Sequence, residues 1–443
     1  MIDPGGILVP LGCMDAENRL DRTALREMQW GKLAGLMERI GGSESFYARR
    51  LVADGVKWGE VGDLDSFVRR VRFTTKEELL ADRLERAPFG SQMLEAVERY
   101  TRFCQTSGTS TGQPMAWLDT PESWESMLKC WRWVYEAAEM VPGVDRVFFA
   151  FSFGPFLGFW TAFEAAARDY LVLPGGGLSS QARLECLRRY QATVLCCTPT
   201  YALRLGEQIG EVSGVRLEEL AVRKVIVAGE PGGCVPAVRR RIEALWGARV
   251  FDHHGMTEVG PVSYETVKRP GGLMVIEEAY LAEVVDRATG EEVEEGACGE
   301  LVLTTLDRAA CPLLRYRTGD LVRKRIVDGR LFLEGGILCR VDDMVLVRGV
   351  NVYPAAVEEV VRGFAEVVEF EVEQREVEAM TELTLRVELA EGTDAGVVER
   401  LGAKLRDTFS LRMPVRVVAA GTLPRHEFKS NRWRKVASGA GVG

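Results

Sequence analysis

Between Cys104 and Leu245, strand-like and helix-like runs alternate, and this alternation constrains the fold more than any other feature of the chain. Apolar runs of strand length are Arg146 to Phe153, Thr193 to Cys197 and Lys224 to Ala228. Runs with helical spacing of apolar residues are Ser179 to Tyr190, Tyr201 to Val212 and Val235 to Leu245. This order is typical of a mainly parallel sheet with helices on its faces, where ligands bind on loops after the carboxyl ends of strands.

The regions on either side of this core have different patterns. Residues 1–100 are helix-like, as in Arg22 to Ile40 and Ser43 to Asp54, and residues 277–338 read as short strands with turns. After these come helix candidates at Pro354 to Phe364 and Asp394 to Phe409, with a strand pair between them. We therefore predict an α/β fold: an N-terminal domain, residues 1–341, with an appended β-rich subdomain, and a small α+β domain, residues 342–443.

Composition and charge exclude several classes of protein. The chain has 443 residues, 47% of them hydrophobic, and a net charge of -9, which argues against a nucleic-acid binder. The first twenty residues lack a basic segment and a long apolar run, so we predict no signal peptide and a cytoplasmic location. The longest uncharged run, Val147 to Phe163, is interrupted by glycine and proline and is too short for a membrane span.

The ten cysteines are scattered, without a C-x-x-C pair, and there are only three histidines. Neither a disulfide framework nor a zinc site is indicated. We expect reduced and mostly buried thiols.

The segment TSGTSTGQP, Thr106 to Pro114, has two glycines and five hydroxyl side chains but no charge. Glycines allow backbone N–H groups to converge on an anion, and hydroxyls add donors. Gly108 and Gly112 lie too close together for a Walker A loop, and the lysine of that motif is missing. A phosphate site and a plain polar turn are both compatible with this segment.

Five further segments are each weak signals alone. VIVAGEPGG ends a strand in a turn, FDHHGMTEVGP contains two histidines, and YRTGDLV places an acid after a glycine. CRVDDMVLVRGVNVYP leads into the last domain, and LPRHEFKSNRWRKV contains an isolated lysine near the C-terminus.

Together and in this order, the segments resemble the adenylate-forming superfamily, and most closely its phenylacetate-CoA ligase branch. The resemblance extends from the helical N-terminal region to the last twenty residues. It implies a large α/β domain and a mobile C-terminal domain with its hinge at Asp342.

The resemblance also implies roles for individual residues. Glu258 matches a Mg²⁺ ligand, Thr257 a phosphate contact, Asp320 the acid on the ribose and Arg340 a cation beside it. Lys429 matches the catalytic lysine between the acyl carboxylate and the α-phosphate. The remaining matches are the ATP phosphate loop (Ser107, Gly108, Thr109, Ser110, Thr111, Gly112), the adenine and ribose contacts (Gly229, Glu230, Pro231, Asp252, His253, His254, Gly255), the thiol tunnel (Arg348, Gly349, Asn351) and the acyl pocket (Phe151, Phe153, Gly154, Phe156).

The implied activity is an AMP-forming acid–thiol ligase that uses ATP, Mg²⁺ and CoA and acts on a small carboxylic acid. The uncharged stretch FSFGPFLGFW favours an aromatic or apolar acid. Two alternatives stay open: transfer to the phosphopantetheine arm of an acyl carrier protein, and a nucleotide-binding scaffold without catalysis. We expect a monomer or a homodimer.

Four positions depart from the family pattern. Gln113 replaces a lysine in a phosphate loop with one extra hydroxyl residue, and His254 replaces the tyrosine that stacks on adenine. Cys339 and Phe428 replace glycines that precede Arg340 and Lys429. These departures leave open how the loop grips the phosphates and how the lysine enters the site.

Overall fold

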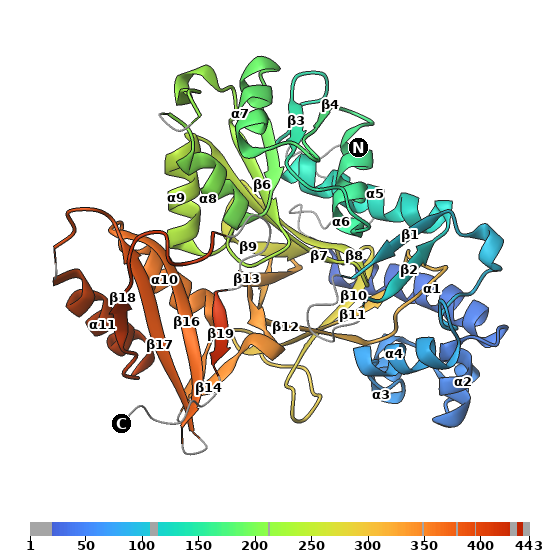
Figure 1. The fold of residues 1–443 in the computed structure, drawn as a ribbon. Helices are drawn as coiled ribbons and strands as arrows, with labels where there is room; N and C mark the ends of the chain where they lie inside the picture. Colours follow the sequence, from blue (N-terminus) through green and yellow to red (C-terminus); the bar gives the residue numbers. More distant parts are fainter. Residues whose placement is uncertain are drawn as a thin grey trace.

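The computed structural model describes residues 20–106, 114–210, 213–347, 350–377, 380–394, 396–425 and 432–436. Within these residues, eleven strands form one sheet in the order β10-β11-β12-β13-β9-β8-β7-β6-β5-β3-β4. This sheet runs through the larger part of the molecule, and the C-terminal domain lies beside it (Figure 1).

The half of the sheet that ends at β4 is parallel, as the alternation predicts. Its strands are β3 (Arg146–Phe149), β4 (Leu171–Pro174), β5 (Val194–Cys197), β6 (Lys224–Ala228) and β7 (Arg249–Met256). Its helices are α5 (Pro121–Ala137), α6 (Leu157–Ala166), α7 (Ser180–Arg189), α8 (Pro199–Glu207) and α9 (Pro236–Trp246). Phe148 packs into the α7–α9 layer, whereas Val147 and Phe149 pack into the α5–α6 layer, because successive side chains of a strand alternate between faces.

Several element boundaries differ from the sequence prediction by a few residues, and two of them have a clear physical reason. The strand expected to reach Phe153 ends at Phe149, and Phe153 has a φ of 53°, which is incompatible with an extended strand. Helix α8 begins at Pro199, two residues early, because proline suits the first helical turn and the Thr198 side chain caps the Tyr201 N–H.

The predicted β-rich region is confirmed as a run of antiparallel strands that joins the sheet through β9. Strands β8 and β9 precede this region in the chain and connect it to the parallel strands, so the antiparallel part of the sheet has six strands among the described residues. The strands are β8 (Gly260–Thr266), β9 (Arg269–Val275), β10 (Tyr280–Val285), β11 (Cys298–Thr305), β12 (Tyr316–Val327) and β13 (Arg330–Arg340).

The N-terminal helices pack against this antiparallel part. They are α1 (Arg22–Gly41), α2 (Phe46–Ala53), α3 (Leu64–Arg70) and α4 (Lys76–Glu85). The apolar faces of α1, α2 and α3 share a core with Leu281, Leu306 and Leu314, whereas Leu79 of α4 packs into the core that contains Trp117 and Tyr316. A separate hairpin of β1 (Arg102–Gln105) and β2 (Ala116–Asp119) flanks the segment 107–113, which contains the predicted phosphate loop and lies outside the described residues.

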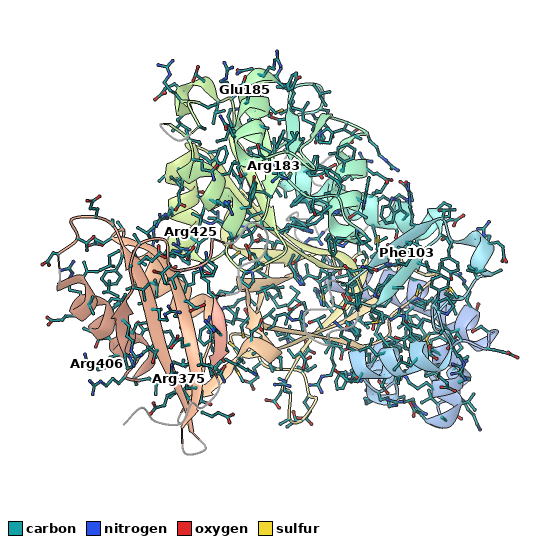
Figure 2. The ribbon with its side chains drawn as sticks, viewed as in Figure 1. Phe103, Arg183, Glu185, Arg375, Arg406 and Arg425 are labelled. Atoms are coloured by element: carbon teal, nitrogen blue, oxygen red, sulfur yellow. The ribbon has the colours of Figure 1, made fainter. Side chains whose placement is uncertain are left out.

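The C-terminal region has its own core and its own sheet, in the order β18-β17-β16-β19, preceded by the β14–β15 hairpin. Figure 2 places Arg425 on the side of this sheet that faces α8. The elements are β14 (Val345–Val347), β15 (Val350–Val352), α10 (Pro354–Arg362), β16 (Val367–Val377), β17 (Met380–Leu389), α11 (Gly396–Phe409), β18 (Val415–Val417) and β19 (Trp433–Val436).

The predicted burial of most cysteines is confirmed for the part of the chain that the structure describes. Its nine cysteines are free thiols, seven of them buried, while Cys298 is exposed and Cys186 is intermediate. In the same residue ranges, no helix combines the length and the apolar character that a membrane crossing requires.

Candidate active site

Strands β7, β12 and β13 bring three of the predicted nucleotide-binding side chains together. The His254 Nε2 lies 3.1 Å from the Asp320 Oδ2, and the Arg340 Nη1 donates to the Asp320 Oδ1 at 3.1 Å. Asp320 and Arg340 are register partners in adjacent strands. Burial would raise the pKa of Asp320, but the hydrogen bond and charge of His254 and the charge of Arg340 outweigh it and hold this pKa below its usual value.

A glycine beside Asp320 makes this arrangement possible. Gly319 has a φ of 76°, and a Cβ built there would stand 2.9 Å from the Arg340 Nη2. A side chain would therefore both strain the backbone and displace the guanidinium. Arg340 is also held through its Nη2, which donates to the Thr318 carbonyl at 3.0 Å.

Asp252 lies deeper, at the carboxyl end of the parallel strands. Its carboxylate accepts from the backbone N–H groups of Cys234 at 2.8 Å and His253 at 2.9 Å. Burial, followed by the charge of Glu265, raises the pKa of Asp252 to about 6. This carboxyl therefore titrates closer to neutrality than an ordinary aspartate.

The adjacent histidines of β7 face opposite sides of the sheet. The ring of His253 packs 4.2 Å from the Trp131 ring, and its Nδ1–H donates to the Ser263 carbonyl at 2.8 Å. Burial, with the neighbouring His254 charge, lowers the pKa of His253 to about 3, so this ring stays neutral. The predicted adenine or ribose contact of His253 is thus limited to its backbone.

His254 and Gly255 lie where β7 changes register with β8. The Nδ1 of His254 is buried and has no hydrogen-bond partner within the described residues. At Gly255, a Cβ would stand 2.7 Å from the Gly260 carbonyl oxygen, so this bulge requires glycine. An unpaired ring nitrogen beside Asp320 is a donor or acceptor available to a ligand.

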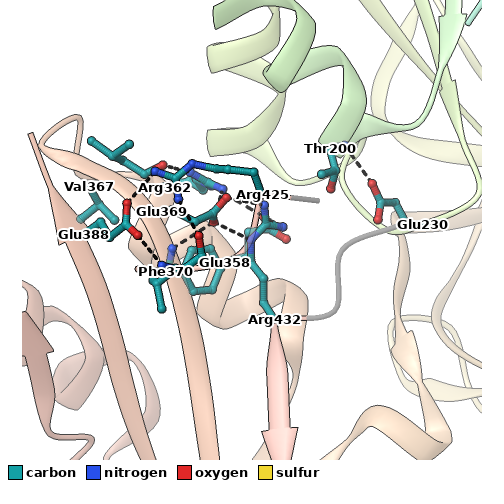
Figure 3. Close-up of polar contacts among 12 residues, drawn as sticks. Thr200, Glu230, Glu358, Arg362, Val367, Glu369, Phe370, Glu388, Arg425 and Arg432 are labelled. Carbon is teal, nitrogen blue, oxygen red and sulfur yellow. Dashed lines mark hydrogen bonds and ion pairs between the residues drawn. The ribbon is translucent and has the colours of Figure 1, made fainter. Parts of the chain in front are cut away.

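The Gly229-Glu230-Pro231 turn follows β6 and is hydrogen-bonded to the start of helix α8. The Glu230 Oε1 accepts from the Thr200 N–H at 2.8 Å, as Figure 3 shows. This bond joins the predicted adenine-binding turn to the start of α8. The turn is therefore positioned by the same layer of helices that covers the parallel strands.

Thr257 and Glu258 form the turn between β7 and β8, and a buried arginine holds their backbone. The Arg308 Nη1 donates to both of their carbonyls at 2.8 Å, and its Nε and Nη2 each donate to Asp119 at 2.6 Å. Asp119 ends β2, so this ion pair connects the hairpin of the predicted phosphate loop to Glu258. Neither Arg308 nor Asp119 lies in a sequence motif, so no local signal marks them as part of the site.

The predicted metal ligand Glu258 is 5% exposed, and the Lys76 Nζ lies 3.6 Å from its Oε1. A carboxylate oxygen is a ligand that Mg²⁺ prefers. No group of three or more potential metal-binding side chains occurs among the described residues. One carboxylate fits a Mg²⁺ ion that takes its other ligands from phosphates and water, as this cation usually does beside a nucleotide.

Several predicted residues lie outside the described part of the chain. These are the phosphate loop (Ser107 to Gly112), Arg348 and Gly349 of the predicted thiol tunnel, the catalytic Lys429, and the side chains of Asp342 and Asn351. The ends of the phosphate loop are described: the Thr106 N–H donates to the Met115 carbonyl at 3.0 Å, and the Met115 N–H donates to the Thr106 Oγ1 at 2.9 Å.

Ion pairs fix both ends of the segment 426–431 that contains Lys429 (Figure 3). Before it, the Arg425 Nη2 donates to the Glu388 Oε2 at 2.5 Å. After it, the Arg432 Nε donates to the Glu369 Oε1 at 2.8 Å, and burial of this pair is nearly complete. Arg425 and Arg432 also line a cavity of about 210 Å³ that faces Thr200 and Arg204 of α8.

The predicted acyl-pocket residues form an aromatic cluster between β3 and α6. The Phe151 ring stacks 4.1 Å from the Phe159 ring, and the Phe153 ring meets the rings of Trp160 and Phe163 edge-on. The Trp160 Nε1 donates to the Gly154 carbonyl at 3.0 Å, and Phe156 meets Phe159 edge-on. Every side chain in this cluster is uncharged.

Two family models match the chain. Residues 98–306 match the AMP-binding enzyme model, and residues 349–434 match the AMP-binding enzyme C-terminal domain model. Among curated proteins, the phenylacetate-coenzyme A ligase of Thermus thermophilus is 32% identical, with 92% of this chain and 95% of that protein covered. The enzyme of the same name from Pseudomonas putida is 29% identical, with 92% and 93% covered.

Among solved structures, 2-hydroxyisobutyryl-CoA ligase is similar to this chain in two states. In the postadenylation state, with an acyl-AMP bound, it has a TM-score of 0.87 at 25% identity and covers 98% of this chain and 94% of its own. In the thioesterification state the TM-score is 0.70, again at 25% identity, covering 98% and 95%. The domain arrangement described above is thus closer to the postadenylation state.

Fold, site and comparisons together define an AMP-forming acid–CoA ligase, an enzyme that activates a carboxylic acid with ATP as an acyl-adenylate and passes it to coenzyme A. This class agrees with the clustering of His254, Asp320 and Arg340 on strands β7, β12 and β13. The chain belongs to the adenylate-forming, or AMP-binding, enzyme family, in its phenylacetate-coenzyme A ligase branch.

Proposed function

We propose that the acid activated by this ligase has an aromatic body. The observation that supports an aromatic acid is the uncharged cluster of Phe151, Phe153, Phe156 and Phe159 at the carboxyl end of β3. Aromatic rings pack favourably in stacked or edge-on pairs, so this cluster suits a planar apolar substrate. The phenylacetate-coenzyme A ligases to which the chain is similar act on such an acid.

The described site residues fit the first half-reaction. A carboxylate oxygen attacks the α-phosphorus of ATP, the bond to the β-phosphate breaks, and pyrophosphate leaves. We assign Asp320, with Arg340 beside it, to the ribose hydroxyls, Asp252 to the adenine amino group, and His254 to the adenine ring. Glu258 would hold Mg²⁺, which neutralises phosphate charge when bound.

In the second half-reaction the thiol sulfur attacks the acyl carbon, the bond to AMP breaks, and the thiol proton is lost. Lys429 is assigned to the first step only, where two anions must approach one another. The domain that contains it would then turn at Asp342 and bring Arg348, Gly349 and Asn351 to the thiol tunnel. The boundary between residues 341 and 342 remains part of this proposal.

Acid-dependent ATP–pyrophosphate exchange tests the substrate class. We expect phenylacetate and ring-substituted relatives to support exchange at a kcat/KM at least tenfold above that of hexanoate or 2-hydroxyisobutyrate. A preference for the aliphatic acids would reject the aromatic proposal while leaving the ligase class intact. No exchange with any acid, while AMP still binds, would instead favour a scaffold without catalysis.

The acceptor is tested by supplying acyl-AMP with either coenzyme A or a holo-carrier protein. We expect thioester formation with coenzyme A, and a preference for the carrier arm would support the alternative acceptor. A cytoplasmic location, which the free thiols and the need for ATP and CoA support, stays a prediction. Sedimentation would decide between a monomer and a homodimer.

A Lys429→Ala variant tests the proposed division between the two half-reactions. We expect adenylation to fall by at least about 100-fold, because a positioned charge at the reacting anions is lost. Thioester formation from supplied acyl-AMP should change by less than about threefold. Equal losses in both half-reactions would contradict the assignment of Lys429 to adenylation.

A further inference from the structure

A buried ion pair between Arg308 and Asp119 lies beside the turn that contains Glu258, the predicted metal ligand. The Arg308 side chain is 2% exposed and the Asp119 side chain 1%. The Arg308 Nε donates to the Asp119 Oδ1 and the Arg308 Nη2 to the Asp119 Oδ2, both at 2.6 Å. Two parallel bonds of this kind fix both the position and the plane of a guanidinium. The third nitrogen of Arg308, Nη1, is thereby held in a defined direction.

This nitrogen bonds to the backbone on both sides of the Glu258 Cα. The Arg308 Nη1 donates to the carbonyls of Thr257 and Glu258, both at 2.8 Å. These carbonyls belong to the two peptide planes that flank the Glu258 Cα, and a peptide plane is rigid. The next carbonyl, that of Val259, accepts from the buried Tyr280 Oη at 2.9 Å. The backbone that carries the Glu258 carboxylate is therefore fixed by side chains behind it.

The other partner of Arg308 fixes it to the hairpin that flanks the predicted phosphate loop. Asp119 is the last residue of β2, and the side chain of the next residue, Thr120, caps α5 by accepting from the Ser123 N–H. The Ser123 Oγ in turn accepts from the Ala310 N–H at 3.2 Å. The segment that contains Arg308 is thus bonded twice to the end of this hairpin and the start of α5.

Stability alone does not account for these buried charges. Removing an arginine and a carboxylate from water is costly, and apolar residues of similar volume are often as stabilising in such a position. An apolar side chain has no donor for two neighbouring carbonyls, whereas a guanidinium has five N–H groups in a fixed geometry. The arrangement therefore favours a role in placing the backbone beside Glu258.

We propose that Arg308 is a positioning residue for the Mg²⁺ ligand. Through the carbonyls on either side of the Cα, it holds the Glu258 carboxylate in place relative to the β1–β2 hairpin, and Asp119 orients the guanidinium. The inference rests on the proposed binding of Mg²⁺ by Glu258. Loss of a group that orients a metal ligand without touching the metal typically lowers metal affinity or activity by about 10–100-fold.

The gain in ATP affinity that Mg²⁺ provides tests this role. It is the ratio of the ATP affinities with Mg²⁺ and with a chelator, measured by calorimetry on the full-length protein without an acid substrate. Arg308→Lys keeps the charge, but an ammonium lacks the planar fork that bonds Asp119 and both carbonyls together. We expect the Mg²⁺ gain of this variant to fall at least about tenfold. Its affinity for AMP in the presence of chelator should stay at the wild-type value.

Two further variants calibrate the measurement. Arg168→Lys is the matched control, because Arg168 also bonds a carboxylate, that of Glu125 at 2.7 Å, but the two side chains are 43% and 38% exposed. This control should keep the wild-type Mg²⁺ gain. Tyr280→Phe removes only the hydroxyl that bonds the Val259 carbonyl, so it should lower the Mg²⁺ gain by a smaller factor than Arg308→Lys. If Arg308→Lys does not fold, an unchanged gain in Tyr280→Phe would contradict backbone positioning of this turn.

A double-variant cycle with Glu258→Gln separates positioning from a general loss of structure. If Arg308 acts through Glu258, Arg308→Lys should lower the Mg²⁺ gain no further in the Glu258→Gln protein. Additive losses in the double variant, or an unchanged gain in folded Arg308→Lys, would overturn the proposal, as would an equal loss of AMP affinity. A wild type that binds AMP but gains no ATP affinity from Mg²⁺ would instead reject Glu258 as the metal ligand, and the inference with it.

Discussion

The histidines at positions 253 and 254 show that a shift of one residue along a strand changes the side of the sheet that a side chain faces. Both lie in one motif, and both were predicted to contact the nucleotide. Alternation along β7 puts the His253 ring against Trp131 in the core and the His254 ring against Asp320. The sequence identified the pair, and the position of the strand in the sheet decided which ring can reach a ligand.

The raised pKa of Asp252 predicts how ATP binding depends on pH. The ionised carboxylate is the form that accepts a hydrogen bond from an adenine amino group. Because this pKa is about 6, we expect the KM for ATP to rise as the pH falls from 7 to 5. The rise should be absent in Asp252→Asn, which has one binding state over this range. The measurement is the KM for ATP in pyrophosphate exchange from pH 5 to 8.

Asp65, whose side chain is 66% exposed, provides the control for that experiment. Asp65→Asn should reproduce the pH profile of the wild type. A flat wild-type profile between pH 5 and 7 would show that Asp252 is not the adenine contact.

At the scale of secondary structure, ion pairs across long sequence distances tie together the elements that hold the site. Asp119 of β2 and Arg308, 189 residues apart, join the hairpin of the predicted phosphate loop to the Thr257-Glu258 turn. Glu369 of β16 and Arg432 before β19, 63 residues apart, fix one end of the segment that contains Lys429. Such pairs act on the site through the backbone they fix.

Removing Glu369 should destabilise the C-terminal domain strongly. Its carboxylate accepts from the Arg432 Nε at 2.8 Å and the Arg362 Nη2 at 3.2 Å, and both arginines are buried. Glu369→Ala leaves these charges without their main partner, which costs about 3–5 kcal/mol. Urea unfolding of the full chain at pH 7 measures the loss in unfolding free energy.

Glu366 offers a matched control from the same domain. It pairs with Arg400 at 3.1 Å, but the two side chains are 37% and 54% exposed. Glu366→Ala should therefore change the unfolding free energy by less than about 1 kcal/mol. Similar losses in Glu369→Ala and Glu366→Ala would reject the account given for Glu369.

At the scale of the whole molecule, the C-terminal domain supplies a hydrogen-bond acceptor that caps the first turn of α9, a helix of the N-terminal domain. The N-cap residue of α9, Val235, makes no side-chain hydrogen bond to the first turn of this helix. Instead, the Glu359 Oε2 of α10 accepts from the Ala237 N–H at 2.6 Å, and its Oε1 lies 3.6 Å from the Arg240 Nη2. A carboxylate at a helix N-terminus satisfies an unpaired N–H group and the helix dipole together.

This contact should stabilise the domain arrangement that the structure shares with the postadenylation state. Glu359→Ala removes a helix cap worth about 1 kcal/mol, so the population of this arrangement should fall several-fold relative to others. We expect the adenylation rate to fall by that factor while thioester formation from supplied acyl-AMP is unchanged or faster. Fluorescence transfer between labels on the two domains would measure the shift directly.

A Glu399→Ala variant in α11 is the control for this prediction, because it removes the same charge from an exposed position of the same domain. Glu399→Ala should leave both half-reactions at their wild-type rates. A Glu359→Ala variant with unchanged half-reaction rates would show that the cap does not influence the balance between arrangements.

Local pattern was sufficient for much of the fold. Both ends of strand β6 were predicted correctly, because a short run of apolar residues marks the strand. The start of α10 at Pro354 was also predicted correctly, because proline favours the first turn of a helix. Arg146 to Phe153 was predicted too long: the strand ends at Phe149, and Phe153 has a positive φ and packs its ring edge-on against Trp160.

By itself, the sequence determined the alternating α/β architecture and the separate C-terminal domain, because short-range periodicity specifies these. Its motifs also predicted nucleotide contacts for Asp252, His254 and Asp320, through their resemblance to a family. Only the tertiary structure decided that Lys76 lies beside Glu258, that Arg308 holds the Thr257-Glu258 turn, and that Glu359 caps α9. Those contacts join residues far apart in the chain, and their positions depend on how whole elements pack around a shared core. No local pattern contains that information.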